Sequence, residues 1–441
     1  MTVRIRNVSI WDGQDGWIER GDLVLENGSI QAVGEQVSGA ASSQDQVIDG
    51  EGKVAVPGFI NAHTHLYSAL ARGMALEGFA PKTFTQILEQ LWWRMDKALD
   101  PASVRSSALV GAMEAVRCGV TTMVDHHASP FAVPGSLDLM KEAVCDEVGL
   151  RGVFCYELSD RDGKTSRDQG IEENLRFLSE HGDSMTGAQF GMHASFTVSD
   201  KTLDSVAERL PEHAGIHIHV AEGPEDEVAC ETKHGARIVD RLDRYGFLKP
   251  NSILAHCLHI NEAEKDLIAA RDAIVVHNPH SNMNNAVGCF DLRGFVDRGI
   301  TVGLGTDGLG CNMLNERFVA GILQNHTHQD ALAGDFNALN GLLFAGNQEI
   351  VSRLLGVRVG RIEAGAPADV VLMDYTPPTP LHSGTIMGHF LFGIAVHNLR
   401  VSDVFVAGRP ILREGTFVSI DEAATYAEAR GQAQAMWNRI Q

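Results

Sequence analysis

The stretch VAVPGFINAHTH, residues 54–65, is a mostly apolar run that ends in two histidines one residue apart. We expect a strand here. Successive strand residues point to opposite faces, so the side chains of His63 and His65 project to the same side. Two neighbouring neutral imidazoles form a natural pair of metal ligands. Two partly buried histidines with separate hydrogen-bond partners are the alternative, and this stretch alone leaves both interpretations open.

Seven more runs of this kind follow in the middle of the chain. Each is short, apolar and rich in β-branched residues, ends in polar residues, and precedes a stretch of helical character. They are TTMVDHH (121–127), RGVFCYE (151–157), GAQFGMHAS (187–195), GIHIHVAE (215–222), SILAHC (252–257), AIVVHNP (273–279) and ITVGLGTDG (300–308). Strands that alternate with helices form parallel sheets, and eight such units predict a closed (β/α)8 TIM barrel of the α/β class. Active sites of such barrels lie at the C-terminal ends of the strands, where these runs carry their polar residues.

Both ends of the chain have a different texture. Residues 3–13 and 21–35 alternate apolar and polar side chains and break at Gly, Asp and Asn, as short strands do, and residues 368–375 and 401–415 repeat the pattern. We therefore expect one small β-sandwich domain built from both ends. In this division residues 1–56 and 358–441 form the sandwich, with a C-terminal helix, and residues 57–357 form a metal-dependent hydrolase barrel.

Composition narrows the class of protein and of partner. The chain has 441 residues, of which 44% are hydrophobic and 21% charged, as in a soluble globular protein. Its formal net charge of -21 argues against nucleic acid and anionic membranes as partners. The seven cysteines are scattered without a CxxC pair, and no stretch has the apolar character of a signal peptide or membrane span. We expect a cytoplasmic protein and a homo-oligomer, most simply a dimer.

Three other runs offer partners for the histidine pair. The fifth ends in HIHVAE, the sixth in LAHC and the eighth in GTDG. A catalytic zinc takes three or so protein ligands and keeps a position open for water, whose acidity the metal raises. Three imidazoles and one carboxylate are available at the predicted barrel mouth, from His63, His65, His219 and Asp307.

Two further residues suit proton transfer. Glu222 lies three residues beyond His219, where the strand has become a loop, and it is placed to exchange protons with a substrate. His256, at the end of the sixth run, is placed to hydrogen-bond the attacking water. The sequence therefore predicts a metal centre with acid–base groups beside it.

The motifs PGFINAHTH, HVAE, LAHC and LGTDG resemble those of the amidohydrolase superfamily, in the branch of aminohydrolases and chlorohydrolases that includes guanine deaminase. The resemblance covers essentially the whole chain. It implies metal ligation by His63, His65, His219 and Asp307, and catalytic roles for Glu222, His256 and Asp307. Residues 90–100, 125–130 and 155–163 are also similar to the SsnA subgroup of aminohydrolases, whose natural substrate these motifs do not disclose.

One feature of the superfamily is absent. Binuclear members carry a carboxylated lysine at the end of strand four, whereas the run GAQFGMHAS is followed by no lysine before Lys201. The resemblance therefore implies a single divalent ion, zinc or alternatively iron. At the matching position relatives offer a histidine to the substrate, here His193. Arg72 matches an arginine that often follows the histidine pair, and it either contacts substrate or braces its loop.

The function expected from these residues is deamination of a small nitrogen heterocycle of purine, pterin or triazine type, by hydrolysis of a C–N bond other than a peptide bond. Asp307 and His256 accept the proton of the activated water, and Glu222 protonates the ring and helps ammonia leave. Ring-opening of a cyclic amide or amidine, hydrolytic dechlorination, and a barrel scaffold without activity are the alternatives.

Several assignments stay open at this point. His126 and His127 end the second run on opposite sides, so one of them faces the site. His217, one step deeper than His219, is a hydrogen-bonded core histidine or a ligand. Residues 84–99 have helical spacing and suit a lid, in which Phe79, Trp92 or Trp93 closes over a flat ring. Asn282 braces its loop or touches a ligand. A second HxH pair lies on a helical pattern, which predicts solvent-facing side chains for His326 and His328.

Overall fold

The predicted barrel is present, and its fourth strand is interrupted. The computed structural model describes residues 2–37, 43, 45–397 and 400–440. The barrel strands are β6 (Phe59–Thr64), β7 (Val120–His127), β8 (Arg151–Tyr156), β9 (Thr186–Ala188) continued by β10 (Phe190–Ala194), β11 (Ile216–Val220), β12 (Ile253–His256), β13 (Ile274–His277) and β14 (Val302–Leu304). They pair in parallel in the orders β6-β7-β8-β9 and β10-β11-β12-β13-β14. Each of the eight predicted runs contains one of these barrel strands, the fourth in two pieces, which confirms the α/β barrel.

Two isolated bridges complete the ring of strands. Thr64 pairs in parallel with Asp307, which brings β6 beside the segment after β14. Leu158 pairs in parallel with Met192, which joins the segment after β8 to β10 across the interruption. The carboxyl ends of all strands therefore lie at one mouth of the barrel.

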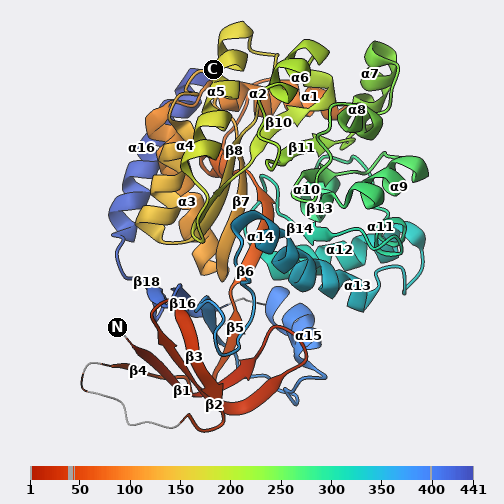
Figure 1. Cartoon of the computed structure of the whole chain (residues 1–441). Helices are drawn as coiled ribbons and strands as arrows, with labels where there is room; N and C mark the ends of the chain where they lie inside the picture. The colour runs from red at the N-terminus through yellow and green to blue at the C-terminus, as the bar shows by residue number, and fades with distance from the viewer. Residues whose placement is uncertain (1, 38–42, 44, 398–399, 441) are drawn as a thin grey trace.

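Helices follow the strands and cover the barrel from outside (Figure 1). The Asp100 side chain accepts from the amide of Ser103 at 2.9 Å, and the Ser103 hydroxyl accepts from the amide of Asp100 at 2.9 Å, a capping box that starts α3. The helices are α3 (Pro101–Arg117), α4 (Ser136–Lys141) with η3 (Glu142–Val148), α5 (Lys164–Glu180), α6 (Asp200–Ala207), α7 (Pro224–His234), α8 (Ile238–Arg244), α9 (Glu262–Arg271), α10 (Pro279–Asn284), α11 (Leu292–Val296), α12 (Met313–His328), α13 (Phe336–Gly341) with η5 (Leu342–Gly346), and α14 (Asn347–Leu355).

A second sheet takes strands from both ends of the chain, as predicted, and lies beside the barrel in Figure 1. Its order is β18-β17-β16-β15-β5-β1-β2-β3, with β4 paired to β1. The two ends meet where β5 and β15 run antiparallel. The strands are β1 (Val3–Trp11), β2 (Trp17–Glu26), β3 (Ser29–Gly34), β4 (Gln46–Asp49), β5 (Lys53–Pro57), β15 (Val370–Asp374), β16 (Val401–Val406), β17 (Arg409–Arg413) and β18 (Thr416–Phe417).

The last helix returns to the barrel. Between β15 and β16 lie α15 (Ile386–Gly388) and η6 (His389–Ala395), and after β18 the chain forms α16 (Glu422–Ile440). Helix α16 packs against α3, as Figure 1 shows. The indole Nε1 of Trp437 donates to the carbonyl of Leu70 at 2.8 Å, which ties the helix to the segment after β6.

The long connection between β6 and α3 carries four short helical pieces: η1 (Leu66–Ala71), α1 (Phe84–Ile87), η2 (Leu88–Trp92) and α2 (Trp93–Lys97). The Thr83 side chain caps α1 by accepting from the amide of Gln86. The η2 piece is one turn of π-helix, a local widening that often occurs at functional sites. These pieces stand over the mouth of the barrel.

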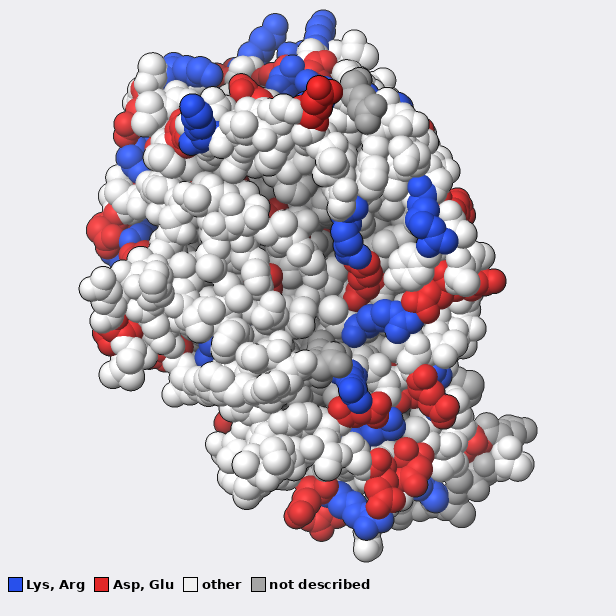
Figure 2. All heavy atoms as spheres, turned by 180° about the vertical axis from the view of Figure 1, so that it is seen from behind, with Lys and Arg blue, Asp and Glu red and all other residues white. Residues whose placement is uncertain are grey.

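Figure 2 shows one face of the molecule, on which acidic and basic side chains are interspersed beside a broad area without charge. The excess of carboxylates is therefore not gathered into one block on this face. None of the helices that the structure describes is long and apolar enough to cross a membrane.

A buried ion pair joins the barrel to the second sheet. Arg151, at the start of β8, donates from Nε and Nη2 to the two carboxylate oxygens of Asp369 at 2.7 and 2.9 Å. The two side chains are 3% and 1% exposed. Asp369 also accepts from the amide of Ala407 at 2.8 Å. Each charge depends on the other because neither has access to water.

We expect Asp369→Asn to lower the free energy of unfolding by about 3–5 kcal/mol, because it leaves the Arg151 guanidinium buried without a counter-charge. Urea denaturation followed by circular dichroism measures the change. The control is Glu172→Gln, which removes a bidentate but exposed partner of Arg209 and should cost less than about 1 kcal/mol. Equal effects of the two variants would contradict a joining role for the buried pair.

Candidate active site

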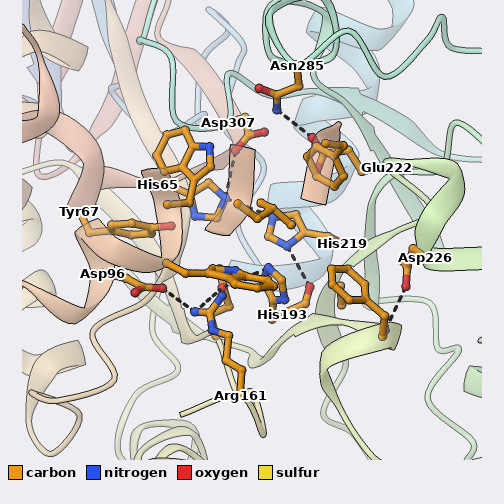
Figure 3. Close-up of a pocket in the computed structure, with 17 residues that line it drawn as sticks. His65, Tyr67, Asp96, Arg161, His193, His219, Glu222, Asp226, Asn285 and Asp307 are labelled. Atoms are coloured by element: carbon orange, nitrogen blue, oxygen red, sulfur yellow. Dashed lines mark hydrogen bonds and ion pairs between the residues drawn. The ribbon is translucent and has the colours of Figure 1, made fainter. Parts of the chain in front are cut away.

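A pocket opens at the mouth of the barrel, and it brings most of the predicted site residues together (Figure 3). Three of the predicted metal ligands and Glu222 lie on its wall, together with His193. The pieces between β6 and α3 supply an aromatic wall that includes Phe84, Trp92 and Trp93. The site therefore combines polar, ionisable groups with flat apolar surfaces.

The four predicted metal ligands converge. One ligand atom from each of His63, His65, His219 and Asp307 lies within 4.8 Å of all the others, and all four residues are buried. The Nε2 atom of His65 is 3.0 Å from Asp307 Oδ1 and 3.1 Å from His219 Nε2. His63 Nε2 is 3.9 Å from the same Asp307 oxygen.

Outer contacts orient each of these imidazoles. His65 Nδ1 is hydrogen-bonded to the carbonyl of His126, and His219 Nδ1 to the carbonyl of His193 at 2.9 Å. His63 Nδ1 is hydrogen-bonded to His217 Nε2 at 2.8 Å, so His217 is a hydrogen-bonded core histidine. A carbonyl accepts the Nδ1 proton and leaves the Nε2 lone pair of that ring free, as in histidines that bind metal.

The donor set fits a divalent cation. The Nε2 atom of His63 is buried without a hydrogen-bond partner among the described residues. Burial lowers the pKa of His63 and of His219, which favours the neutral, ligating form. Burial also lowers the pKa of His65, but the Asp307 carboxylate outweighs it and raises this pKa to about 9. Three nitrogens and one carboxylate oxygen are ligands that suit zinc.

The carboxylate of Asp307 is held by its own neighbours. Oδ2 accepts from the Ser281 hydroxyl at 2.6 Å, and Oδ1 from the amide of Gly308 at 2.9 Å. Burial raises the pKa of Asp307, but the hydrogen bond and the charge of His65 outweigh it and hold this pKa well below its usual value. Asp307 is therefore ionised, as a metal ligand requires.

His256 and Glu222 stand beside this cluster. His256 Nδ1 is hydrogen-bonded to the amide oxygen of Asn282 at 2.8 Å, so Asn282 braces the ring. The Nε2 lone pair then faces Glu222 Oε2 at 3.5 Å and Asp307 Oδ2 at 3.6 Å. Glu222 accepts from Asn285 Nδ2 at 3.0 Å, and burial raises the pKa of Glu222. A raised pKa suits a carboxyl group that must carry a proton.

The backbone at these strand ends is unusual. Ala221, His256, Cys257 and Asp307 all have positive φ, at 47°, 73°, 54° and 54°. Side chains other than glycine rarely adopt this region, and strain of this kind gathers where a site needs a particular geometry. Here it turns the chain at the ends of three strands so that His256, Glu222 and Asp307 face one another.

The two predicted substrate contacts differ in position. His193 lines the pocket, with Nδ1 hydrogen-bonded to Thr197 Oγ1 at 2.7 Å, and burial lowers its pKa to about 3. Arg72 is not brought into this pocket. Its side chain is 70% exposed and donates twice, at 2.6 Å, to Glu114 in a neighbouring hollow. The geometry shows the loop-bracing interaction that the sequence left as an alternative for Arg72.

Sequence reasoning missed four charged residues of the pocket: Asp96, Glu157, Arg161 and Asp226. Glu157, which ends the third run, lies with Arg161 and Asp96 on the pocket wall. Burial raises the pKa of Glu157, but the ring of His126 and the Arg161 guanidinium outweigh it and hold this pKa well below its usual value. Burial raises the pKa of Asp96 to about 7 against the charge of Arg161. A carboxylate at a barrel strand end was the available signal for Glu157, whereas nothing local marked Asp96.

The structure also gives positions for the other residues that the sequence left open. His126 faces inward, with Nδ1 3.2 Å from Glu157 Oε2, whereas His127 is hydrogen-bonded to Ser129 at 2.9 Å. Both Trp92 and Trp93 line the pocket, and Phe79 does not. The second histidine pair, His326 and His328, is exposed on α12.

Comparison with known proteins agrees with the geometry. The model of the amidohydrolase family matches residues 54–411. A 5-methylthioadenosine/S-adenosylhomocysteine deaminase of Thermococcus sibiricus is 31% identical over 89% of this chain and 90% of its own length. A 5'-deoxyadenosine deaminase of Methanopyrus kandleri is 30% identical over 92% of both chains.

Solved structures show the same architecture. An adenosine deaminase from Xanthomonas campestris with bound zinc has a TM-score of 0.84 and 25% identity, covering 98% of both chains. The atrazine chlorohydrolase TrzN from Arthrobacter aurescens, complexed with zinc, has a TM-score of 0.81 and 22% identity, covering 98% of this chain and all of its own. The second likeness concerns the fold alone.

We expect the purified protein to hold close to one equivalent of zinc or iron, because the four converging ligand atoms form one cluster. His219→Ala removes one of them and should lose the ion. Elemental analysis of dialysed protein measures this, with His326→Ala as the control because that histidine is exposed on a helix. Two tightly held ions per chain would contradict the single-ion site.

Proposed function

We propose that one zinc or iron ion serves at the four-residue cluster of this chain, which belongs to the amidohydrolase family and is a metal-dependent deaminase. In this proposal Glu222 exchanges protons with the substrate, an amino-substituted purine, pterin or triazine. The bond that the enzyme hydrolyses is a C–N bond other than a peptide bond. The observation that carries this proposal is the placement of an acid–base carboxyl beside the ligand cluster, inside one aromatic pocket.

The shape of the pocket suits a flat ring. Phe84, Trp92, Trp93 and Phe196 contribute aromatic faces to its wall, and planar heterocycles stack on such surfaces. The relatives from Thermococcus and Methanopyrus are named for adenine-containing substrates, which supports an aminated purine-type ring here. The helical pieces between β6 and α3 line the pocket, and shielding it from water would strengthen the electrostatic interactions inside.

Each residue of the site has a distinct task in this proposal. A bound divalent ion supplies a Lewis acid that lowers the pKa of water. His256 presents its Nε2 lone pair toward Asp307, and the two accept the proton released by the water. Glu222, whose burial favours the protonated form, gives its proton to the ring nitrogen beside the amino carbon and then passes the remaining proton of the added hydroxyl to the departing amine. The proton held by Asp307 and His256 finally returns to Glu222. Asn285 and Asn282 keep Glu222 and His256 in place.

Within the family we place the chain with the SsnA subgroup, in the aminohydrolase and chlorohydrolase branch. Residues 90–100 and 155–163 carry that similarity, and they supply Trp92, Trp93, Asp96, Glu157 and Arg161 to the pocket. In this proposal these stretches determine which heterocyclic substrate the enzyme binds more than the metal motifs do.

Zinc-loaded protein should release ammonia from at least one ring in a panel of adenosine, 5'-deoxyadenosine, guanine, pterin and a diaminotriazine, because all carry an amino group on an electrophilic ring carbon. A coupled ammonia assay measures this, and the apoprotein is the control. If ammonia is released from none of them and a cyclic amide is opened instead, the deaminase assignment is wrong.

We expect Glu222→Gln to retain the metal and the fold but to lower kcat by about 10²–10⁴-fold, because it keeps the shape and removes the exchangeable proton. Asp307→Asn should lower both metal content and kcat, since Asp307 is ligand and base together. Glu316→Gln is the matched control, a buried carboxylate bound to His280 outside the pocket. Wild-type turnover by Glu222→Gln would show that Glu222 is not the proton carrier.

A further inference from the structure

A second group of charged residues lies in the same pocket and has no task in the proposed reaction. Figure 3 shows Asp96 and Arg161 on the side away from Glu222 and Asn285. Arg161 Nη2 donates to Asp96 Oδ2 and lies 3.6 Å from Glu157 Oε1. These residues belong to the stretches 90–100 and 155–163, which are similar to the SsnA subgroup and supply none of the proposed metal ligands.

Part of this group is buried without partners. Asp96 Oδ1, Arg161 Nη1 and Trp93 Nε1 are buried and make no hydrogen bond to any residue that the structure describes. Asp96 as a whole is 1% exposed. Buried polar atoms are nearly always paired, and an unpaired charged group is costly. Asp96 and Arg161 both line the pocket, so this unpaired acceptor and this unpaired donor are suited to a ligand that offers the complementary pair.

The group begins at the reaction centre. A Glu157 carboxylate oxygen lies within 4.8 Å of ring nitrogens of His65 and His219, two of the metal ligands. Arg161 contacts Glu157, and Asp96 in turn contacts Arg161. A heterocycle held with its amino carbon at the metal cluster therefore turns its own edge, and not a distant substituent, toward Arg161 and Asp96.

The charges around Arg161 define the kind of edge. Its guanidinium is surrounded by the carboxylates of Asp96, Glu157 and Asp162, the last at 3.1 Å from Nε. The positive charge of Arg161 is therefore already offset, so this residue offers little attraction to a phosphate or carboxylate on the ligand. Neutral groups that donate and accept hydrogen bonds fit this surrounding.

We propose that Asp96 and Arg161 bind a lactam edge, so that the substrate of the deaminase proposed above is an oxo-amino heterocycle. Asp96 Oδ1 accepts from the ring N–H, and Arg161 Nη1 donates to the neighbouring ring carbonyl. Glu157 anchors Arg161 in place for this contact. A neutral adenine ring has no N–H beside a carbonyl and leaves both atoms unpaired.

Matched ligand pairs test the proposal. Isocytosine and 2-aminopyrimidine, or guanine and 2-aminopurine, carry the same amino carbon and differ in the lactam edge. Calorimetric titration of zinc-loaded Glu222→Gln protein at pH 8, where Asp96 is ionised, measures binding without relying on turnover. The lactam member of each pair should bind roughly 10- to 100-fold tighter, since two hydrogen bonds to charged groups are gained. Equal binding within both pairs would overturn the proposal.

A pair of variants separates recognition from scaffolding. Asp96→Asn should reduce the preference for the lactam member by about 10-fold or more. Asp162→Asn is the matched control, because Asp162 also contacts Arg161 and is buried but does not line the pocket. The control should keep the preference. Equal loss in both variants would assign the effect to the placement of Arg161 and would overturn recognition by Asp96. If Asp96→Asn does not fold, the titrations of the protein that retains Asp96 decide the question.

Failure of this inference differs from failure of the proposed function. Ammonia release from adenine-type rings, without preference for a lactam edge in the titrations, would leave the deaminase assignment standing and overturn the lactam contact. Selective binding of lactam rings without ammonia release from any ring of the panel would support the contact and contradict the deaminase assignment.

Discussion

Backbone hydrogen bonds between β6 and the segment after β14 are the constraint on which the site depends. The carbonyl of His63 accepts from the amides of Thr306 and Asp307 at 3.0 and 3.1 Å, and Asp307 pairs with Thr64. These contacts complete the barrel and set the Asp307 carboxylate against the histidine pair. A ligand from the first strand and one from the last thus meet because the ring of strands is closed.

The same arrangement places several energetically unfavourable features at the mouth of the barrel. Neutral imidazoles are buried side by side, Asp307 and His256 have positive φ, and the His63 Nε2 atom has no hydrogen-bond partner among the described residues. Strain and unpaired groups of this kind are maintained by the surrounding structure, here by the outer contacts from His126, His193 and His217. A bound cation offsets part of this cost, so metal binding and the stability of the barrel mouth are linked.

How much of the structure can be predicted from the sequence depends on how far apart in the chain the interacting residues lie. The barrel follows from periodicity, and the four ligands and Glu222 follow from residue types at strand ends, because a barrel places all such ends together. Asp96, on α2, and Arg161, after β8, lie 65 residues apart and come into contact only in the folded chain, so no local pattern marks this contact. The role of Arg72 stayed open for the same reason, because its partner Glu114 lies 42 residues away on a helix. Only the register of β7 in the barrel decides that His126 faces inward and His127 does not.

We infer that water, activated at the four-residue cluster, replaces the amino group of a ring. Turnover in ¹⁸O-water, with protein stripped by a chelator and reloaded with increasing zinc, tests this most directly. We expect one ¹⁸O in the ring product for each ammonia released, at a rate proportional to bound zinc up to one equivalent. Ammonia release without ¹⁸O in the ring, or undiminished turnover by metal-free protein, would contradict it.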